Sequence, residues 1–140
     1  MRSLKSILSV CALTLAAAGV NAEVVVIVNP KNPAANLSAE QVAALYLGNS
    51  STFPDGGAAT LADQPESAGV RGTFYEKATG RSAAQAKATW ARLTFTGKGT
   101  PPKELKSDAD VKAFVASDPK AIGYVDSSPV DGSVKAVLKL

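Results

Sequence analysis

The stretch that decides the fold is residues 23–48, EVVVIVNPKNPAANLSAEQVAALYLG. It begins with an unbroken β-branched run, Val24–Val28, which is typical of a strand buried on both faces of a sheet. The NPKNP segment then turns the chain. Ser38 is predicted to cap the following helix, with Gln41 three residues on completing a capping box, and Gly48 is predicted to end it. A doubly buried strand followed at once by a capped helix favours an α/β domain.

Helices and strands alternate through the rest of the chain. The patterns predict a short strand over 58–62, a helix from Gly69 or Val70 to Ala78, a second helix capped by Ser82, a loop over 94–102, a helix over 108–116, a buried strand over 121–125 and an edge strand over 134–140. Strands separated by helices predict an α/β domain, a small mixed sheet flanked by helices.

The first 22 residues have the pattern of a secretory signal peptide. A basic start, MRSLK, precedes the apolar stretch ILSVCALTLAAAGV, and the small-residue pattern before Ala22 marks a cleavage site. The apolar stretch is short for a membrane span. We therefore expect 1–22 to be removed on export, leaving a single domain, 23–140, in the periplasm and without a membrane span.

Composition excludes several classes of function. The sequence has no histidine, and its one cysteine, Cys11, lies in the predicted leader, so thiolate and histidine chemistry are unavailable to the domain. Of 15 basic residues Arg2 and Lys5 also lie in the leader, so 13 remain against 12 acidic residues. A charge so close to balance predicts no general attraction to nucleic acid.

The candidate binding site is the polar run that precedes the helix at Gly69. Here the start of a helix offers unpaired backbone N–H groups beside a serine and an arginine, a combination that favours an anion. The hydroxyl of Ser67, the amides of the segment and the guanidinium of Arg71 would surround an oxyanion. The candidate ligand-binding residues are Ser67, Ala68, Gly69, Arg71, Gly72 and Thr73.

A second interpretation of the same residues stays open. Ser67 could simply cap the helix, and Arg71 could be a solvated residue of the first turn. An arginine is mildly unfavourable at this end of a helix unless a negative group is near, and Glu66 could be that group.

No stretch carries the pattern of a catalytic or metal site. The run Gly97-Lys98-Gly99 precedes two prolines, so it is not a Walker loop. Asp108 and Asp110 are expected at a helix start for dipole reasons, and no calcium-loop spacing occurs. A serine nucleophile would need a lysine base, and no suitable motif is present. We expect neither an enzyme, nor a cofactor, nor a metal.

Three stretches in this order resemble the phosphate-binding subunits of ABC transporters. LSAEQVAALYLGNSSTFPDGG is similar to a stretch of that family, ADQPESAGVRGTFYE stands in the place of its phosphate loop, and AIGYVD is similar to its closing strand. The resemblance covers nearly the whole domain. It implies one lobe of a periplasmic-binding-protein-like fold, in a short, single-lobe subgroup of the family.

The resemblance implies phosphate or a similar oxyanion as ligand. In the phosphate loop of the family an arginine precedes the serine, whereas here Gln64 stands near that place and Arg71 follows Ser67. A single lobe leaves an anion half solvated, so a homodimer or a separate envelope or transporter protein would supply the other wall. The alternative is a non-catalytic interaction module that has lost ligand binding. An apolar patch near Phe53, Tyr75 and Phe95 in the structure would favour it.

Overall fold

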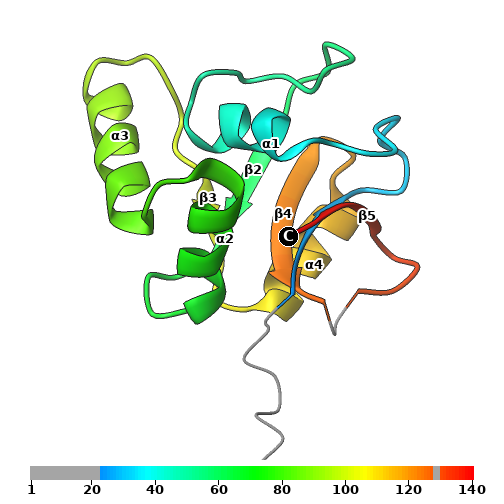
Figure 1. The fold of residues 1–140 in the computed structure, drawn as a ribbon. Helices are drawn as coiled ribbons and strands as arrows, with labels where there is room; N and C mark the ends of the chain where they lie inside the picture. Colours follow the sequence, from blue (N-terminus) through cyan, green and yellow to red (C-terminus); the bar gives the residue numbers. More distant parts are fainter. Residues whose placement is uncertain (1–22, 128–129) are drawn as a thin grey trace, which may run out of the picture.

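The computed structural model describes residues 23–127 and 130–140, so the predicted leader over 1–22 lies outside the described residues. Five strands form one sheet in the order β3-β2-β4-β1-β5 (Figure 1). The strands are β1 (Val24–Val28), β2 (Thr60–Asp63), β3 (Lys103–Glu104), β4 (Ala121–Asp126) and β5 (Lys135–Lys139). The helices are α1 (Ala39–Tyr46), α2 (Gly69–Thr79), α3 (Ala83–Phe95) and α4 (Asp108–Ser117).

The sheet is mixed, as predicted. β1 runs antiparallel to both β4 and β5, whereas β2 runs parallel to both β4 and β3. The predicted edge strand at the end of the chain is indeed the edge strand β5. The predicted fold class, a small mixed sheet flanked by helices, is confirmed.

Each face of the sheet has its own core. Successive side chains of β1 point to opposite faces, so Val24, Val26 and Val28 join the core under α1 and α2, while Val25 and Ile27 join the core under α4. All five side chains are buried, which confirms the prediction of a strand covered on both faces. On the α4 face the backbone of β4 needs Gly123, because a Cβ there would lie 2.5 Å from Cγ1 of Val111.

The helix α3 does not cover the sheet. It stands beyond α2, away from the strands (Figure 1). Its buried residues Ala86 and Trp90 face inward, and the indole Nε1–H of Trp90 donates to the carbonyl oxygen of Tyr46 at 2.7 Å. The opposite face of α3 is therefore left to solvent.

The predicted helix ends are confirmed where the sequence carries capping residues. Ser38 and Ser82 form complete capping boxes with Gln41 and Gln85. Gly48 and Gly80 end α1 and α2 with φ of 76° and 70°, the left-handed region that favours glycine.

The largest differences from the predictions are the bounds of two elements and one additional strand. β2 spans Thr60–Asp63 instead of 58–62, and α3 continues to Phe95, into the segment predicted to be a loop. The short strand β3 was not predicted at all. It has only two residues and follows two prolines, so no alternating pattern marks it, and the free edge of β2 decides where it pairs.

Candidate functional site

The candidate site lies where the parallel strands end. β2, β3 and β4 run in the same direction, and Asp63 at the end of β2 is paired with Glu104 at the end of β3. The carboxyl ends of parallel strands are where ligands bind in open α/β sheets. The chain passes from β2 through residues 64–68 into α2, so the predicted binding segment lies at this edge.

The start of α2 is not capped by a side chain. Ala68 is the N-cap residue, and Ser67 is exposed one position before it, so the interpretation of Ser67 as a cap is wrong. The first turn holds no acidic residue, whereas the first turn of α4 is capped by Ser107 and holds two. A Cβ at Gly69 or at Gly72 would have nothing within 4 Å, so the surface there is open to a ligand.

Fewer backbone amides are free at this helix start than the sequence suggested. The N–H of Ala68 donates to the carbonyl oxygen of Pro65 at 2.9 Å, and the N–H of Arg71 donates to that of Ala68 at 3.1 Å. Gly69 and Val70, as the first two helical residues, have no acceptor within the helix. Thr73 donates its hydroxyl to the carbonyl oxygen of Gly69 at 3.2 Å.

Arg71 points away from this exposed turn. Its side chain reaches under the segment before α2, where Nη1 donates to the carbonyl oxygen of Gln64 at 2.8 Å. The guanidinium lies 5.9 Å from the ring centre of Tyr75 and 3.7 Å from a carboxylate oxygen of the exposed Glu104. Only 7% of Arg71 is exposed, so the interpretation of a solvated arginine is wrong.

Glu66 is not the direct partner of Arg71. Its carboxylate accepts a hydrogen bond from the ammonium of Lys87 on α3, and this bond, with a smaller contribution from Arg71, lowers the pKa of Glu66. Arg71, Lys87, Glu66 and Glu104 line a shallow hollow of about 200 Å³ together with Asp63, Tyr75, Trp90, Pro101 and Pro102. The hollow carries charges of both signs, and neither Ser67 nor Gly69 lines it.

Arg71→Ala is expected to lower the free energy of unfolding by about 2 kcal/mol, because it removes the donor to the Gln64 carbonyl and the packing of a buried side chain. Urea denaturation would measure the change. Lys77→Ala on the exposed side of α2 is the control, with an expected change below about 0.5 kcal/mol. An unfolding midpoint that Arg71→Ala leaves unchanged would contradict this account of the buried side chain.

A network of buried polar groups lies beside the start of α2, at the end of β2. It was not predicted from the sequence. Asp63, 5% exposed, accepts hydrogen bonds from the hydroxyl groups of Tyr75 (2.6 Å) and Tyr124 and from the backbone N–H of Gln64 (2.8 Å). Burial, and then the negative charge of Asp63, raise the pKa of both phenols well above the ordinary value of 10.0. Both tyrosines therefore remain neutral donors that hold the carboxylate in place.

The side chain of Gln64 belongs to the same network. Its amide nitrogen donates to the carbonyl oxygen of Tyr124 at 2.9 Å and to Oδ1 of Asp108 at 2.6 Å, which ties the end of β2 to β4 and to the start of α4. Gln64, which stands near the place of the phosphate-loop arginine in the resembled family, thus points inward. The polar run Asp63-Gln64 directly after a predicted strand was the available signal.

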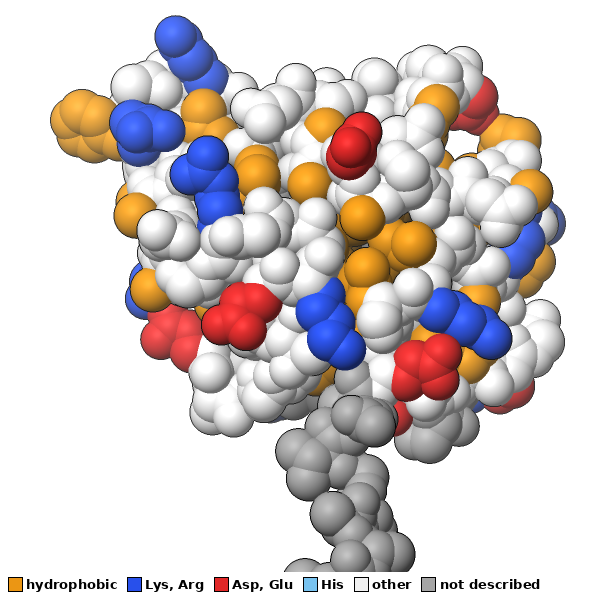
Figure 2. Space-filling view, in the orientation of Figure 1, with side chains coloured by type: hydrophobic (Ala, Val, Ile, Leu, Met, Phe, Trp, Pro, Cys, Tyr) orange, Lys and Arg blue, Asp and Glu red, His pale blue; other side chains and the backbone are white. Residues whose placement is uncertain are grey.

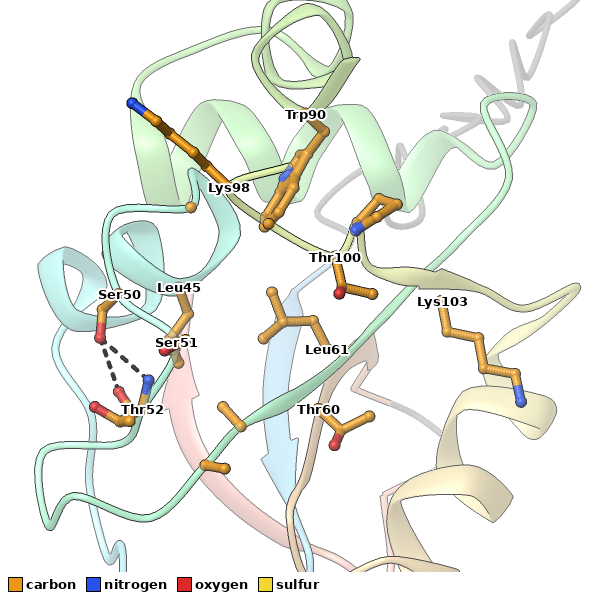
Figure 3. A pocket seen from close by; sticks show the side chains of 15 residues that line it. Leu45, Ser50, Ser51, Thr52, Thr60, Leu61, Trp90, Lys98, Thr100 and Lys103 are labelled. Atoms are coloured by element: carbon orange, nitrogen blue, oxygen red, sulfur yellow. Dashed lines mark hydrogen bonds between the residues drawn. The ribbon is translucent and has the colours of Figure 1, made fainter. Parts of the chain in front are cut away.

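A larger pocket lies elsewhere, between the start of β2 and the loop after α3. It has a volume of about 550 Å³. Leu61 and the ring of Trp90 point into it, while the ammonium ends of Lys98 and Lys103 point away from it (Figure 3). The ammonium of Lys103 lies 5.1 Å from the ring centre of Phe114. The ammonium groups are thus directed away from the pocket, and its centre is lined by apolar side chains.

Among residues 23–127 and 130–140, none of the helices is long and apolar enough to cross a membrane. No group of three acidic side chains in that part of the chain is placed to hold a metal ion.

Comparison with known proteins agrees with this geometry at the level of the fold. No family profile and no curated protein matches the sequence. Among solved structures, an ABC-type phosphate transport receptor from Vibrio cholerae is 22% identical with a TM-score of 0.64, covering 82% of this chain and 45% of that one. A candidate phosphate ABC transporter substrate-binding protein from Clostridium perfringens, solved with bound phosphate, is 21% identical with a TM-score of 0.67, covering 82% and 44%.

The fold matches one lobe of a periplasmic-binding-protein fold. PstS from Borrelia burgdorferi, 13% identical, matches with a TM-score of 0.59 and the same coverage of this chain. The expected resemblance to phosphate-binding subunits is therefore confirmed for the fold, at sequence identities that carry the fold alone. The chain spans less than half the length of these structures.

Proposed function

We propose that this protein is an exported, non-enzymatic binding protein that holds phosphate or a similar oxyanion at the start of α2. The observation that carries the proposal is the helix start itself. It is exposed, has no capping side chain and no acid in its first turn, and lies at the edge where the parallel strands end. The fold supports the same proposal, because solved structures of this fold include one with bound phosphate.

The residues of the site would act in different ways. The hydroxyl of Ser67 and the N–H groups of Gly69 and Val70 would donate to the anion, and the missing side chains at Gly69 and Gly72 would allow it to approach the backbone. Arg71 would contribute its charge from beneath the turn, because its guanidinium is held against Gln64. Ala68 and Thr73 would border the anion, since the N–H of Ala68 and the hydroxyl of Thr73 already have acceptors.

One lobe provides one wall of a binding cleft. An anion at the start of α2 would keep much of its hydration, so we expect weak binding unless a second chain covers it. A homodimer or a separate envelope protein, such as a component of a phosphate ABC transporter, would provide that cover.

The alternative, an interaction module, is not supported by an apolar patch at Phe53, Tyr75 and Phe95. Of the three aromatic residues whose patch would favour it, Phe53 and Tyr75 are 3% and 1% exposed, and only Phe95 is on the surface. The three residues do not form a patch, because Phe53 packs into the core under α1 and Tyr75 bonds to Asp63.

Ser67→Asp is expected to weaken phosphate binding at least tenfold. The new carboxylate would repel an anion held by the same helix start, while its charge would stabilise α2 slightly through the helix dipole. Calorimetric titration with phosphate and then sulfate at low salt, on the chain from Glu23 onward, would measure the effect.

The control adds the same charge at another helix start. Ala109→Asp lies on an exposed position in the first turn of α4, and we expect it to leave the affinity unchanged. Equal dissociation constants for the two variants would rule out the α2 site. The absence of any heat in the parent chain at millimolar phosphate would do the same.

A further inference from the structure

The charges of the domain are unevenly distributed along the sequence. From Lys77 to Lys103 there are six basic residues and no acidic one. This stretch contains all of α3, the helix that does not pack on the sheet and whose outer face is exposed to solvent. On the face drawn in Figure 2, basic side chains gather over α3, and the acidic side chains of this face lie outside that group.

The end of α3 combines these charges with an exposed aromatic residue. Phe95, the last residue of the helix, is 93% exposed, the one large hydrophobic side chain so exposed among residues 23–127 and 130–140. Arg92 lies one turn before it, at the i, i+3 spacing that places two side chains on the same face. Arg92 is exposed and takes part in no ion pair in the described part of the chain.

The loop after α3 carries a second exposed cation, Lys98, three residues after Phe95. Gly97 adopts a left-handed conformation with φ of 70°, and the N–H of Lys98 then donates to the carbonyl oxygen of Leu93 at 2.9 Å. This bond folds the chain back on the last turn of α3. The side chain of Lys98 extends into solvent (Figure 3) and forms no ion pair within the described residues.

We propose that this end of α3 docks on an anionic lipid bilayer, with Phe95 entering the headgroup region and Arg92 and Lys98 binding lipid phosphates. A bilayer accepts a single protruding ring without a matching pocket, and flanking basic residues are the usual partners of such a ring at a membrane surface. The stretch has no acidic residue of its own, and the carboxylate of Glu66, which lies against α3, is paired with Lys87, so little negative charge opposes an anionic surface there. The proposal does not depend on anion binding at α2.

Co-sedimentation with lipid vesicles tests the proposal on the chain from Glu23 onward, which contains all five strands and both cores. We expect binding to vesicles that contain phosphatidylcholine and phosphatidylglycerol, no binding to phosphatidylcholine alone, and loss of binding at high salt. Phe95→Ser should lower the partition coefficient about tenfold, and Phe95→Trp should restore it. Arg92→Gln and Lys98→Gln should each lower it about fivefold.

Lys106→Gln is the matched control. It removes one positive charge from an exposed residue that lies outside this surface. We expect it to change vesicle binding less than Arg92→Gln or Lys98→Gln does. Because Phe95 is almost fully exposed, Phe95→Ser should leave the unfolding midpoint unchanged. Failure to bind phosphatidylglycerol vesicles, or binding that Phe95→Ser does not reduce, would overturn the proposal and favour an acidic protein as the partner of this surface.

Discussion

Raising the pH above about 10 is expected to unfold the protein within a narrow interval, because all three of its tyrosines are buried. Burial, followed by the charge of Asp63, raises the pKa of Tyr46, Tyr75 and Tyr124 in the folded chain. In the unfolded chain the phenols ionise near their ordinary value of 10.0, so the unfolded state then binds fewer protons. The stabilisation is complete below that pH and falls above it, by up to about 4 kcal/mol per pH unit for three protons.

The measurement is a titration that follows phenolate absorbance and circular dichroism together. We expect both signals to change at the same pH, because a tyrosine ionises only when the chain unfolds. Tyr46→Phe should reduce the slope of the unfolding free energy against pH by about one third. Phenolate that forms gradually while the circular dichroism is still native would show that at least one hydroxyl group is open to solvent.

Asp63→Ala is expected to lower the free energy of unfolding by about 4 kcal/mol. The substitution removes the acceptor of three buried donors, the hydroxyl groups of Tyr75 and Tyr124 and the N–H of Gln64. The N–H of Gln64 keeps a second acceptor, the hydroxyl oxygen of Tyr124 at 3.2 Å, but the two hydroxyl groups lose theirs. Leaving a buried donor without a partner costs about 1–3 kcal/mol, so the two hydroxyl groups outweigh the gain from no longer burying a carboxylate. Denaturation by urea at neutral pH would measure the loss.

A double-mutant cycle with Tyr75→Phe separates this explanation from simple loss of packing. In the parent chain Tyr75→Phe should destabilise, because Oδ2 of Asp63 loses a donor at 2.6 Å. In the Asp63→Ala background the same change should stabilise, because it removes a hydroxyl that no longer has an acceptor. If Tyr75→Phe destabilises both backgrounds equally, the carboxylate does not act through its hydrogen bonds.

Periodicity and capping residues were sufficient to predict most of the elements. β1 and β4 are runs of apolar residues that the sheet buries on both faces, and α1 and α3 begin at serine capping boxes. These signals are local, because a strand pattern or a cap depends on residues within one or two turns of each other. β3 carries no such signal, since its pairing depends on β2, about forty residues earlier in the chain.

The candidate site divides in the same way. The helix start with Ser67 and Gly69 could be recognised from the sequence, because an anion-binding turn is made by consecutive residues. The direction of Arg71 could not, since its neighbours Gln64 and Glu104 are brought together by the pairing of β2 with β3. The carboxylate of Asp63 was missed for the same reason, because Tyr124 reaches it from β4.

The sequence by itself therefore determined the α/β class, the burial of β1 and β4 on both faces of the sheet, and the helix start that would hold an oxyanion. Only the tertiary structure decided that Arg71 turns into the protein, that Asp63 is held by two tyrosines, and that Phe95 and Arg92 are exposed at the end of α3. The physical reason is the distance along the chain between the residues that interact. Hydrogen bonds within a turn are set by neighbouring residues, whereas the partner of a buried charge and the exposure of a helix face depend on how distant segments pack.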